Sequence, residues 1–274
     1  MAPSPSSLKR VARRSKALTI AAWIGKNELT GLRERIGRAG STGLGATHAS
    51  FSLDQSLAYI DGVVADFRRY AGLDAGALEG ARVLEVGPGD SLGVALELLG
   101  DGAREVVCVD RFHTRRDPAQ QSAIQRALLE RAEGARRERL ERVIGPDGAL
   151  RDGEGPALVE GVAIEDAPAA LGSGGFDAVI SRAVLAHVWD LDRALGAIDS
   201  LLSPGGLSAH KVDLSDHGVF SDAGHNPLTF LTVPDALYDR MRRHTGLTNR
   251  RLIDSYRDWH SAHGYEAELL VTRV

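Results

Sequence analysis

The central part of the chain alternates short, continuous apolar runs with longer segments whose apolar residues recur every three to four positions. Runs of this kind, bounded by glycine or polar residues, are typical of strands buried on both faces, and the wider spacing is typical of amphipathic helices. The runs predict strands at 81–87, 105–110, 158–166, 176–184 and 207–214, and a last strand at 266–274. Strands that alternate with helices predict an α/β fold, a Rossmann-like, doubly wound and mostly parallel sheet.

Helical spacing fills the intervals between these runs. In residues 55–70 the apolar side chains recur at steps of three and four, and Ser52 or Asp54 stands where an N-cap is expected. Further helices are expected at 91–100, 121–144, 190–202 and 252–263. The apolar patch 17–24 lies among basic residues and predicts an amphipathic helix. This helix has two interpretations: it packs on the main domain, or it contacts a membrane surface or an anionic partner.

The same patterns suggest how the chain is organised. Residues 1–79 are expected to form an N-terminal helical extension or lid, and residues 80–274 one α/β domain. Residues 215–250 carry scattered His, Asn and Pro and are expected to be irregular, and residues 215–262 are expected to form an insertion after the fifth predicted strand.

Charge and composition exclude several classes of protein. A net charge of −4 argues against a nucleic-acid partner, which calls for a strong basic excess. Cys108 is the single cysteine and cannot form an internal disulfide, which favours a reducing, cytoplasmic setting. No apolar run approaches the ~18 residues needed to span a bilayer, so no stable membrane insertion is expected.

The first apolar run ends in VLEVGPGDSLG, residues 83–93. Glycine accepts positive φ and lets a ligand touch the backbone, and the helix that follows presents free N–H groups. The spacing of Gly87, Gly89 and Gly93 is one residue longer than the dinucleotide fingerprint G-x-G-x-x-G. Glu85 and Asp90 would repel a pyrophosphate. The turn therefore favours a ligand with cationic groups, such as the sulfonium and ammonium of S-adenosylmethionine.

This segment resembles motif I of the class I S-adenosylmethionine-dependent methyltransferases. FDAVISRAVLAHV (176–188) looks like the fourth-strand motif of that family, and LLSPGGLSAHK (201–211) like its turn into the fifth strand. The resemblance covers roughly residues 80–213, and it implies a methyltransferase whose methyl donor is S-adenosyl-L-methionine.

The resemblance also implies a donor site. Glu85, Gly87 and Gly89 would hold the methionine end and Asp110 the ribose, while an acid after the third strand would lie near the adenine amino group. Phe112 would stack on the adenine or, alternatively, cover the core. The implied site consists of Glu85, Gly87, Pro88, Gly89, Asp90, Leu92, Asp110, Arg111, Phe112, Ile164, Glu165, Ser181 and Arg182.

A narrower likeness points to the acceptor. Together with the motifs above, HKVDLSDHGVF (210–220) and the later NRR (249–251) look like a group of bacterial methyltransferases, some of which belong to polysaccharide or secondary-metabolite biosynthesis. That implies a small-molecule or glycan acceptor, methylated at oxygen. Residues 1–60 and 215–262 would form its pocket.

Methylation of a hydroxyl needs a base, and three polar residues beyond the fourth and fifth strands are candidates. Histidine titrates near neutral pH, so His187 and His217 are expected to act as general base. Asp213 is the better partner for His217, since His210 and Asp213 face opposite sides of a strand. Ordinary loop residues and a metal site that includes His225 are the alternatives. The spacing matches no compact zinc signature, so no metal is predicted.

Other residues keep two interpretations. Asn249, Arg250 and Arg251 either hold an anionic acceptor or begin a helix with solvated arginines. Trp189, Trp259 and Tyr256 either line the acceptor pocket or pack in the core. His48 and Tyr59 are expected to lie over the donor.

Two further questions concern function and assembly. Two alternative functions stay open: a nicotinamide-dependent oxidoreductase, and a donor-binding protein that catalyses a non-methylating reaction such as cyclisation.

The family's sheet has seven strands, whereas this chain provides six predicted ones. The unfilled slot would expose an edge, so a homodimer through that edge is expected.

Overall fold

The computed structural model describes residues 15–35 and 47–272. The chain divides into two compact units, which we call the sheet unit and the helical unit. The sheet unit comprises Ser41–Leu185 and Arg193–Lys211, and the helical unit comprises Met1–Gly40, Ala186–Asp192 and Val212–Val274. The basic residues before position 15 and the loop residues 41–46 lie outside the described residues. The division expected at residues 79 and 80 stays a prediction.

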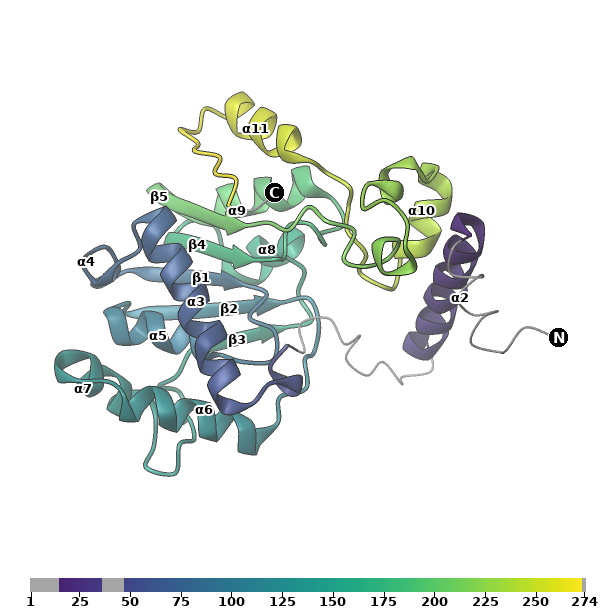
Figure 1. Cartoon of the computed structure of the whole chain (residues 1–274). Coiled ribbons are helices and arrows are strands. Elements are labelled where there is room, and N and C mark those ends of the chain that lie inside the picture. Colours follow the sequence, from purple (N-terminus) through teal and green to yellow (C-terminus); the bar gives the residue numbers. More distant parts are fainter. Residues whose placement is uncertain (1–14, 36–46, 273–274) are drawn as a thin grey trace. The chain divides into compact units, whose positions relative to one another are not determined.

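The sheet unit contains a five-stranded, all-parallel sheet in the order β3-β2-β1-β4-β5. Its strands are β1 (Arg82–Val86), β2 (Glu105–Asp110), β3 (Ala157–Glu160), β4 (Phe176–Arg182) and β5 (Leu202–Lys211). The order reverses between β1 and β4, as in doubly wound folds, so the predicted fold class is confirmed. Figure 1 shows the strands as a twisted layer.

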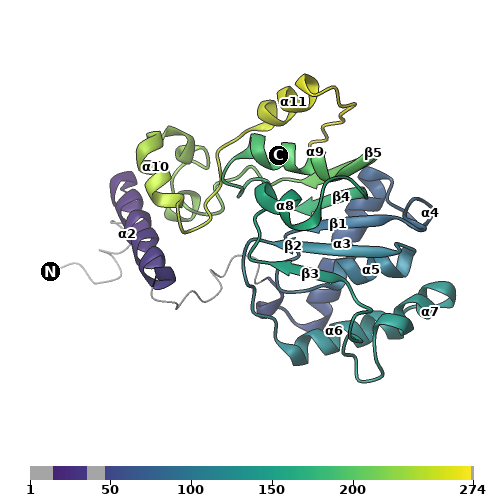
Figure 2. The same ribbon diagram turned by 180° about the vertical axis from the view of Figure 1, so that it is seen from behind.

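Helices cover both faces of this sheet. One face carries α3 (Leu53–Ala71), α4 (Ala75–Leu78), α5 (Gly93–Asp101), α6 (Pro118–Glu130) and α7 (Gly134–Val143), which contact one another. The other face carries α8 (Ala167–Leu171) and α9 (Leu191–Leu201), seen in front in Figure 2. Helix α3 begins at the predicted cap: Ser52 and Gln55 form a reciprocal capping box.

The predicted helix at 121–144 is wrong in one respect, because the structure has two helices there. Helix α6 ends at Glu130, and Gly134 begins α7 with a φ of 54°. The break leaves Arg131 beside two carboxylates, Asp61 at 2.5 Å and Glu97 at 3.0 Å. Arg136 also binds Glu97, as well as Asp101. Interhelical ion pairs of this kind leave no periodic pattern in a sequence.

Three predicted strands also need correction. Strand β3 stops at Glu160, because Gly161 turns with a φ of 79°, and the 3₁₀ helix η2 (Ile164–Asp166) follows. Strand β5 begins at Leu202, since residues 203–206 form an irregularity within it rather than a turn before it. Residues 266–272 form no strand; Leu269, Leu270 and Val271 are exposed there, so the apolar run lacks a sheet to join.

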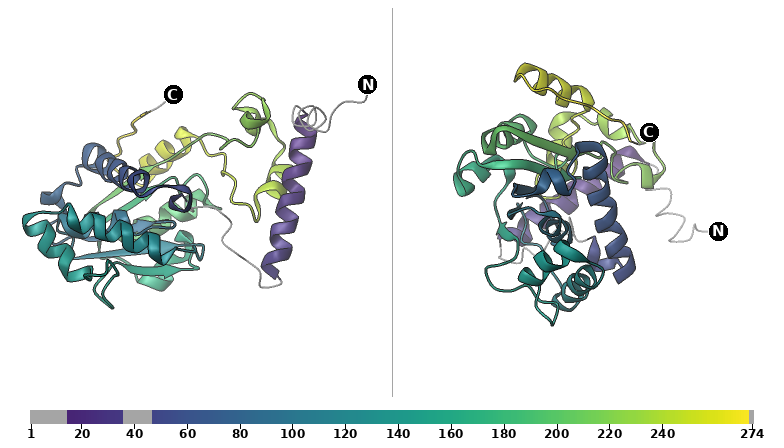
Figure 3. Two further views of the ribbon diagram at one scale, coloured as in Figure 1. Left: turned by 60° about the horizontal axis from the view of Figure 1, so that its bottom comes forward. Right: turned by 90° about the vertical axis from the view of Figure 1, so that its left-hand side faces the viewer.

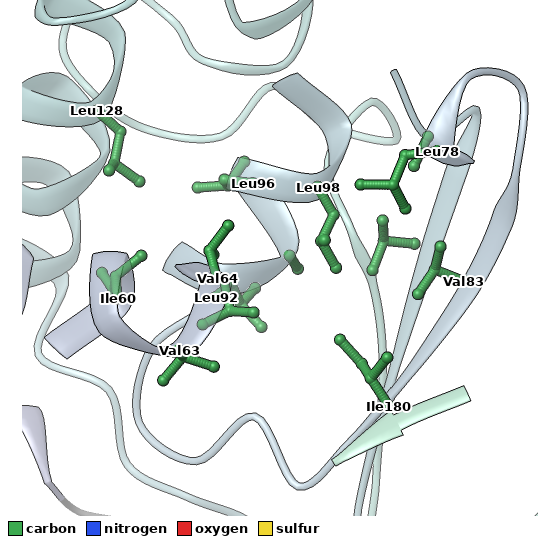
Figure 4. Close-up of a cluster of buried hydrophobic side chains, with 14 of the residues drawn as sticks. Ile60, Val63, Val64, Leu78, Val83, Leu92, Leu96, Leu98, Leu128 and Ile180 are labelled. Carbon is green, nitrogen blue, oxygen red and sulfur yellow. The ribbon is translucent and has the colours of Figure 1, made fainter. Parts of the chain in front are cut away.

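The core of the sheet unit packs α3 and α5 against β1 and β4. Ile60, Val63 and Val64 of α3 meet Leu96 and Leu98 of α5, as the close-up in Figure 4 shows. These side chains are buried, as the apolar spacing of both helices predicts. The core therefore fixes the start of α5, where the glycine turn ends.

The helical unit is built around a second core. Helix α2 (Lys16–Arg35) lies beside α10 (Asp235–Arg242), as Figure 3 shows, and α11 (Ile253–Ala262) follows later in the chain. Ile20, Trp23 and Ile24 of α2 pack against a buried cluster that includes Phe220 and Phe230. Residues 215–250, read as irregular from the sequence, thus contain the helix α10 and two 3₁₀ turns, η3 (Ser221–Ala223) and η4 (Thr229–Thr232).

Candidate functional site

The glycine turn lies where the strand order reverses, at the carboxyl end of β1. Gly87 and Gly89 have φ values of 73° and 68°, in the left-handed region that favours glycine. A Cβ on Gly87 would meet Val184 Cγ2 at 2.4 Å. The turn after β1 thus needs glycine for its own conformation and for the close approach of the segment after β4, besides any ligand.

Gly93, the third glycine, has a different purpose. It begins α5, and a Cβ there would meet Ile60 Cδ1 at 2.2 Å. Leu92, just before it, is buried in the core. The late position of Gly93 therefore serves the packing of α5 on α3, and the ligand-facing part of the turn is its first half.

The Asp90 carboxylate ties the turn to the segment that precedes α3. It is 2% exposed, and its two oxygens accept hydrogen bonds from the backbone N–H groups of His48 (3.0 Å) and Ala49 (2.8 Å). These residues form the 3₁₀ helix η1 (His48–Ser50). Asp90 thus holds η1 against the glycine turn, a partner that no pattern in the sequence indicates.

A hollow of about 400 Å³, part of it open to solvent, lies beside the turn. Its lining comes from η1, α3, β1 with its turn, and β4: His48, Tyr59, Ile60, Val63, Phe67, Glu85, Gly87, Pro88, Ser91, Val94, Ile180, Ser181 and Arg182. Five of the predicted donor residues, and both residues expected to lie over the donor, are brought together here.

Glu85 is the buried acid of this hollow. Burial raises its pKa to about 7, although a hydrogen bond from the Cys108 thiol and the charge of Arg116 act in the opposite direction. The distance from Cys108 Sγ to Glu85 Oε2 is 3.6 Å. A cationic ligand group beside Glu85 would favour its ionised form, so this carboxyl suits an ammonium and penalises an anion.

Asp110 ends β2 beside the turn. Its carboxylate accepts the Phe112 N–H at 2.9 Å, and burial raises its pKa. Arg116 spans this region, since it donates to the Gly89 carbonyl oxygen (2.6 Å) and to Glu160 Oε1 (2.7 Å). The second-strand acid is thus held next to the glycine turn, where the resemblance expects a ribose.

The residues assigned to the adenine end are spread more widely. Phe112 is half-buried with the guanidinium of Arg111 at 5.6 Å from its ring, and Ile164 is buried in η2. Glu165 is half-buried. None of these four residues, nor Asp110, lines the hollow described above, so their roles toward the donor stay predictions.

Ser181 ends the buried part of β4 and faces a histidine. Its Oγ lies 2.8 Å from His210 Nδ1, and His210 Nε2 lies 2.6 Å from Ser208 Oγ. Ser181 is 1% exposed and lines the hollow. Both ring nitrogens of His210 are therefore held by serine hydroxyls within the sheet unit.

Arg182 follows Ser181 at the end of β4. Its Nη1 donates to Asp66 Oδ2 of α3 at 3.0 Å, and Lys211 Nζ, at the end of β5, donates to the same oxygen at 2.6 Å. The Arg182 guanidinium also lies 5.1 Å from the ring centre of Tyr59. Sequence reasoning missed Asp66 and Lys211 because they are distant from the glycine turn in the chain.

In the helical unit, the structure brings the three candidate catalytic residues together. The His187 and His217 rings are 4.7 Å apart, and His217 Nε2 lies 3.9 Å from Asp213 Oδ2. His187 Nδ1 lies 2.7 Å from the Gly246 carbonyl oxygen, so Nδ1 carries the proton and donates. Burial, and then the nearby His217, lower the pKa of His187. Neutral His187 therefore presents a lone pair at Nε2, as a general base requires.

The other charged candidates of the helical unit stabilise its own chain. Arg250 donates to the Val233 carbonyl oxygen at 2.6 Å and pairs with Asp235, and Arg251 pairs with Asp192 at 3.3 Å. The Asn249 N–H donates to the Ala186 carbonyl oxygen at 2.6 Å. These contacts favour the interpretation in which this run holds the fold.

The aromatic candidates divide. Trp259 and Tyr256 are buried, and Trp259 stacks on His263 with ring centres 4.0 Å apart. Trp189 is 44% exposed and carries the Arg242 guanidinium 4.1 Å from its ring centre. His225 lies against Phe220, and within the described ranges no group of three His, Cys, Asp or Glu side chains is placed to hold a metal ion.

The hollow fits the methionine end of the predicted donor. His48 is 4% exposed, its Nδ1 has no hydrogen-bond partner among the described residues, and burial lowers its pKa. A buried ring nitrogen without a partner, in the wall of a hollow, calls for a polar ligand atom. Glu85 offers a carboxylate for an ammonium, and the wall carries no second acid.

Comparison with known proteins identifies the family of this domain. The family model described as a methyltransferase domain matches residues 57–268, well over half of the 274 residues. No curated protein matches the chain. None of the described helices combines the length and apolar character that crossing a bilayer requires.

Several solved methyltransferase structures are also similar to this chain. Selenomethionine-substituted CurJ carbon methyltransferase has 15% identity and a TM-score of 0.31, over 61% of this chain and 42% of that one. The trans-methyltransferase CalH in complex with SAH has 17% identity and a TM-score of 0.36, over 72% and 55%. A complex of the Haloferax volcanii Trm112 methyltransferase activator with a methyltransferase has 17% identity and a TM-score of 0.29, over 72% and 95%.

The chain spans less than two thirds of the length of the first two structures, and at these identities and TM-scores none of the three carries an argument about the acceptor. The family match decides between the functions that the sequence left open, in favour of methyl transfer over nicotinamide chemistry. The chain therefore contains an S-adenosylmethionine-dependent methyltransferase domain and belongs to the methyltransferase domain family.

Proposed function

We propose that this methyltransferase acts on a hydroxyl group of a small molecule in a bacterial biosynthetic pathway. The observation that carries the proposal is the 2.7 Å contact between His187 Nδ1 and the Gly246 carbonyl oxygen, an acceptor that requires the proton to be on Nδ1. A hydroxyl is a poor nucleophile until its proton leaves, and a neutral imidazole with a free lone pair at Nε2 accepts that proton.

His217 and Asp213 support that role. Burial pushes the pKa of Asp213 upward, but hydrogen bonds from Ser215 and the charge of His217 outweigh it, so the pKa of Asp213 is lowered. An ionised Asp213 stabilises positive charge on the histidine pair once a proton has been taken up.

The methyl donor supplies the reactive group, and the residues of the chain would bind and orient it. S-adenosylmethionine, when bound, supplies a methyl group on a sulfonium, already a strong electrophile. Glu85, Gly87, Ser181 and His48 would bind and orient the amino-acid end beside the glycine turn. The protein's contribution to the rate is then largely positional, together with removal of one proton.

The transferred methyl group tests the proposal. The protein is incubated with S-adenosylmethionine labelled with ¹³C at the methyl group and a pool of hydroxylated, amino and unsubstituted small molecules. We expect S-adenosylhomocysteine to form, and the ¹³C chemical shift of the new methyl group to be that of a methyl ether. A methyl group on nitrogen or carbon in the product would contradict the proposal.

We further propose a cytoplasmic setting and a homodimer. The single cysteine, Cys108, is buried and unpaired, which suits a reducing compartment. Strand β5 ends the described sheet and leaves its outer edge for another strand. Light scattering tests the homodimer, and a monomer at micromolar concentration would refute it.

A further inference from the structure

Two cations share one carboxylate oxygen at the carboxyl ends of β4 and β5. Arg182 Nη1 and Lys211 Nζ both donate to Asp66 Oδ2, at 3.0 Å and 2.6 Å. The three side chains are partly exposed, at 28% for Arg182, 39% for Lys211 and 26% for Asp66. Two positive charges against one negative charge leave this cluster with one uncompensated positive charge.

The surroundings do not remove that charge. Within the described residues, the Arg182 side chain makes no second hydrogen bond, and its guanidinium lies 5.1 Å from the ring centre of Tyr59. Of the remaining groups in the wall of the hollow, Glu85 is the one acid, and it is fully buried with a pKa raised to about 7. His48 is buried with a lowered pKa, so it adds no positive charge near neutrality. The cationic character of the hollow therefore comes from Arg182.

The arrangement is suited to a planar anion. Asp66 occupies one edge nitrogen of the guanidinium and holds the side chain in place, which leaves Nε and Nη2 for a bidentate partner. Lys211 lies on the same carboxylate oxygen and supplies a second, more mobile charge. Arg182 lines the hollow together with Glu85 and Gly87.

We propose that Arg182 and Lys211, held by Asp66, form a carboxylate-binding subsite of this methyltransferase. Two ligands present a carboxylate there: the amino-acid end of the methyl donor, and an acceptor that is itself an acid. The first source rests on the proposed placement of the donor, and the second defines a class of acceptor. Asp66 is a positioning residue in either case.

Calorimetric titration separates the two sources without any turnover. The ligands are S-adenosylhomocysteine and its decarboxylated analogue, which keeps the ammonium group, titrated into the wild type, R182Q, R182K and K211Q. If the donor uses the subsite, the wild type prefers S-adenosylhomocysteine over the analogue, and R182Q loses that preference. The loss is roughly 10–100-fold, as for one charge-assisted, bidentate contact. R182K retains part of the preference, and K211Q shows a smaller loss.

Malonate titrated into protein saturated with S-adenosylhomocysteine tests the second source. Binding that is weakened in both R182Q and K211Q, with no preference between the two adenosine ligands, assigns the subsite to an acidic acceptor. The matched control is R137Q, an exposed arginine of α7 in the same unit. It should change none of these affinities.

The proposal is overturned if the variants melt like the wild type, the two adenosine ligands bind equally well to all of them, and malonate does not bind. A wild type that binds neither adenosine ligand would count against the donor site itself. The malonate titration would still decide the carboxylate subsite in that case.

Discussion

Polar and charged side chains line a hollow in the sheet unit, whereas similar side chains stabilise the chain itself in the helical unit. In the sheet unit, Glu85 and Ser181 sit at strand ends around a hollow, and the strands that carry them hold them there. In the helical unit, Arg250 and Arg251 lie in a segment between helices, and their side chains form hydrogen bonds and ion pairs within that unit. The sheet itself thus places polar residues around the hollow, whereas the loop arginines hold their own segment in place.

The exception in the helical unit is its histidine pair, and the largest expected effect tests it. His187→Gln should slow methyl transfer to a hydroxyl acceptor by roughly 10²–10⁴-fold, because the base is lost. The affinity for S-adenosylhomocysteine should not change. Because the pKa of His187 is lowered by burial, the wild-type rate should rise with pH below 6.5 and level off above it.

His260→Gln is the matched control for this variant. His260 belongs to the same unit, and its Nδ1 likewise lies 2.7 Å from a backbone carbonyl oxygen, that of Tyr256. An equal loss of rate in both variants would show that these rings only support the fold.

The next effect concerns stability in the sheet unit. Glu97 is 4% exposed and holds Arg131 and Arg136, so Glu97→Gln leaves two guanidinium groups with weaker partners. The free energy of unfolding should fall by on the order of 3 kcal/mol. Urea denaturation measures this fall. Glu141→Gln, in an exposed pair with Arg137, should cost only about 0.3–0.5 kcal/mol.

A third variant separates the conformation of the glycine turn from its contacts. Gly87→Ala should destabilise the protein by about 1–3 kcal/mol and weaken S-adenosylhomocysteine binding, because its Cβ adds a clash with Val184 to an unfavourable φ. Gly172→Ala is the control, since it has a φ of 81° and open space around its Cβ. Equal melting temperatures for the two variants would mean that the approach of Val184 has no energetic weight.

The smallest expected effect is a pH dependence of donor binding. Glu85 has a pKa raised to about 7, so it is largely protonated at pH 6 and ionised at pH 8. A donor that pairs its ammonium with Glu85 should bind up to about tenfold more tightly at pH 8 than at pH 6 and release a proton on binding. Calorimetry in buffers of different ionisation enthalpy measures that proton. Glu85→Gln should remove the dependence.

The same carboxyl affects stability in the opposite direction. Because its pKa is higher in the folded state than the usual value of 4.5, the folded protein holds the proton more tightly between that value and about 7. Its contribution to stability is therefore present below pH 4.5 and is lost as the pH rises through 7.

The sheet could be predicted closely because its strands follow a local rule. The run EVVCVD predicts β2 at the residues where it is found, since a strand buried on both faces must be apolar throughout. The apolar run at residues 266–272 breaks that rule: a strand also needs a neighbour to bond with, and no local pattern reports one.

Some residues of the candidate site could also be predicted from the sequence, and others could not. Glu85, Gly87 and Gly89 could be found because a turn after a strand has strict steric needs. Asp66 and Lys211 could not, since a carboxylate on a helix surface looks like any solvated residue until the fold brings a cation to it. The partners of Asp90, far along the chain at His48 and Ala49, were hidden for the same reason.

The hydrogen bonds between Asp90 and η1 have a thermodynamic consequence for the segment before α3. Two backbone N–H groups of η1 donate to the Asp90 carboxylate of the glycine turn. The ordering of residues 48–50 is therefore coupled to the ordering of the turn. Coupling between two such events is reciprocal. A donor molecule that orders the turn therefore protects these amides from hydrogen exchange, and any contact that holds η1 in place raises donor affinity by the same factor.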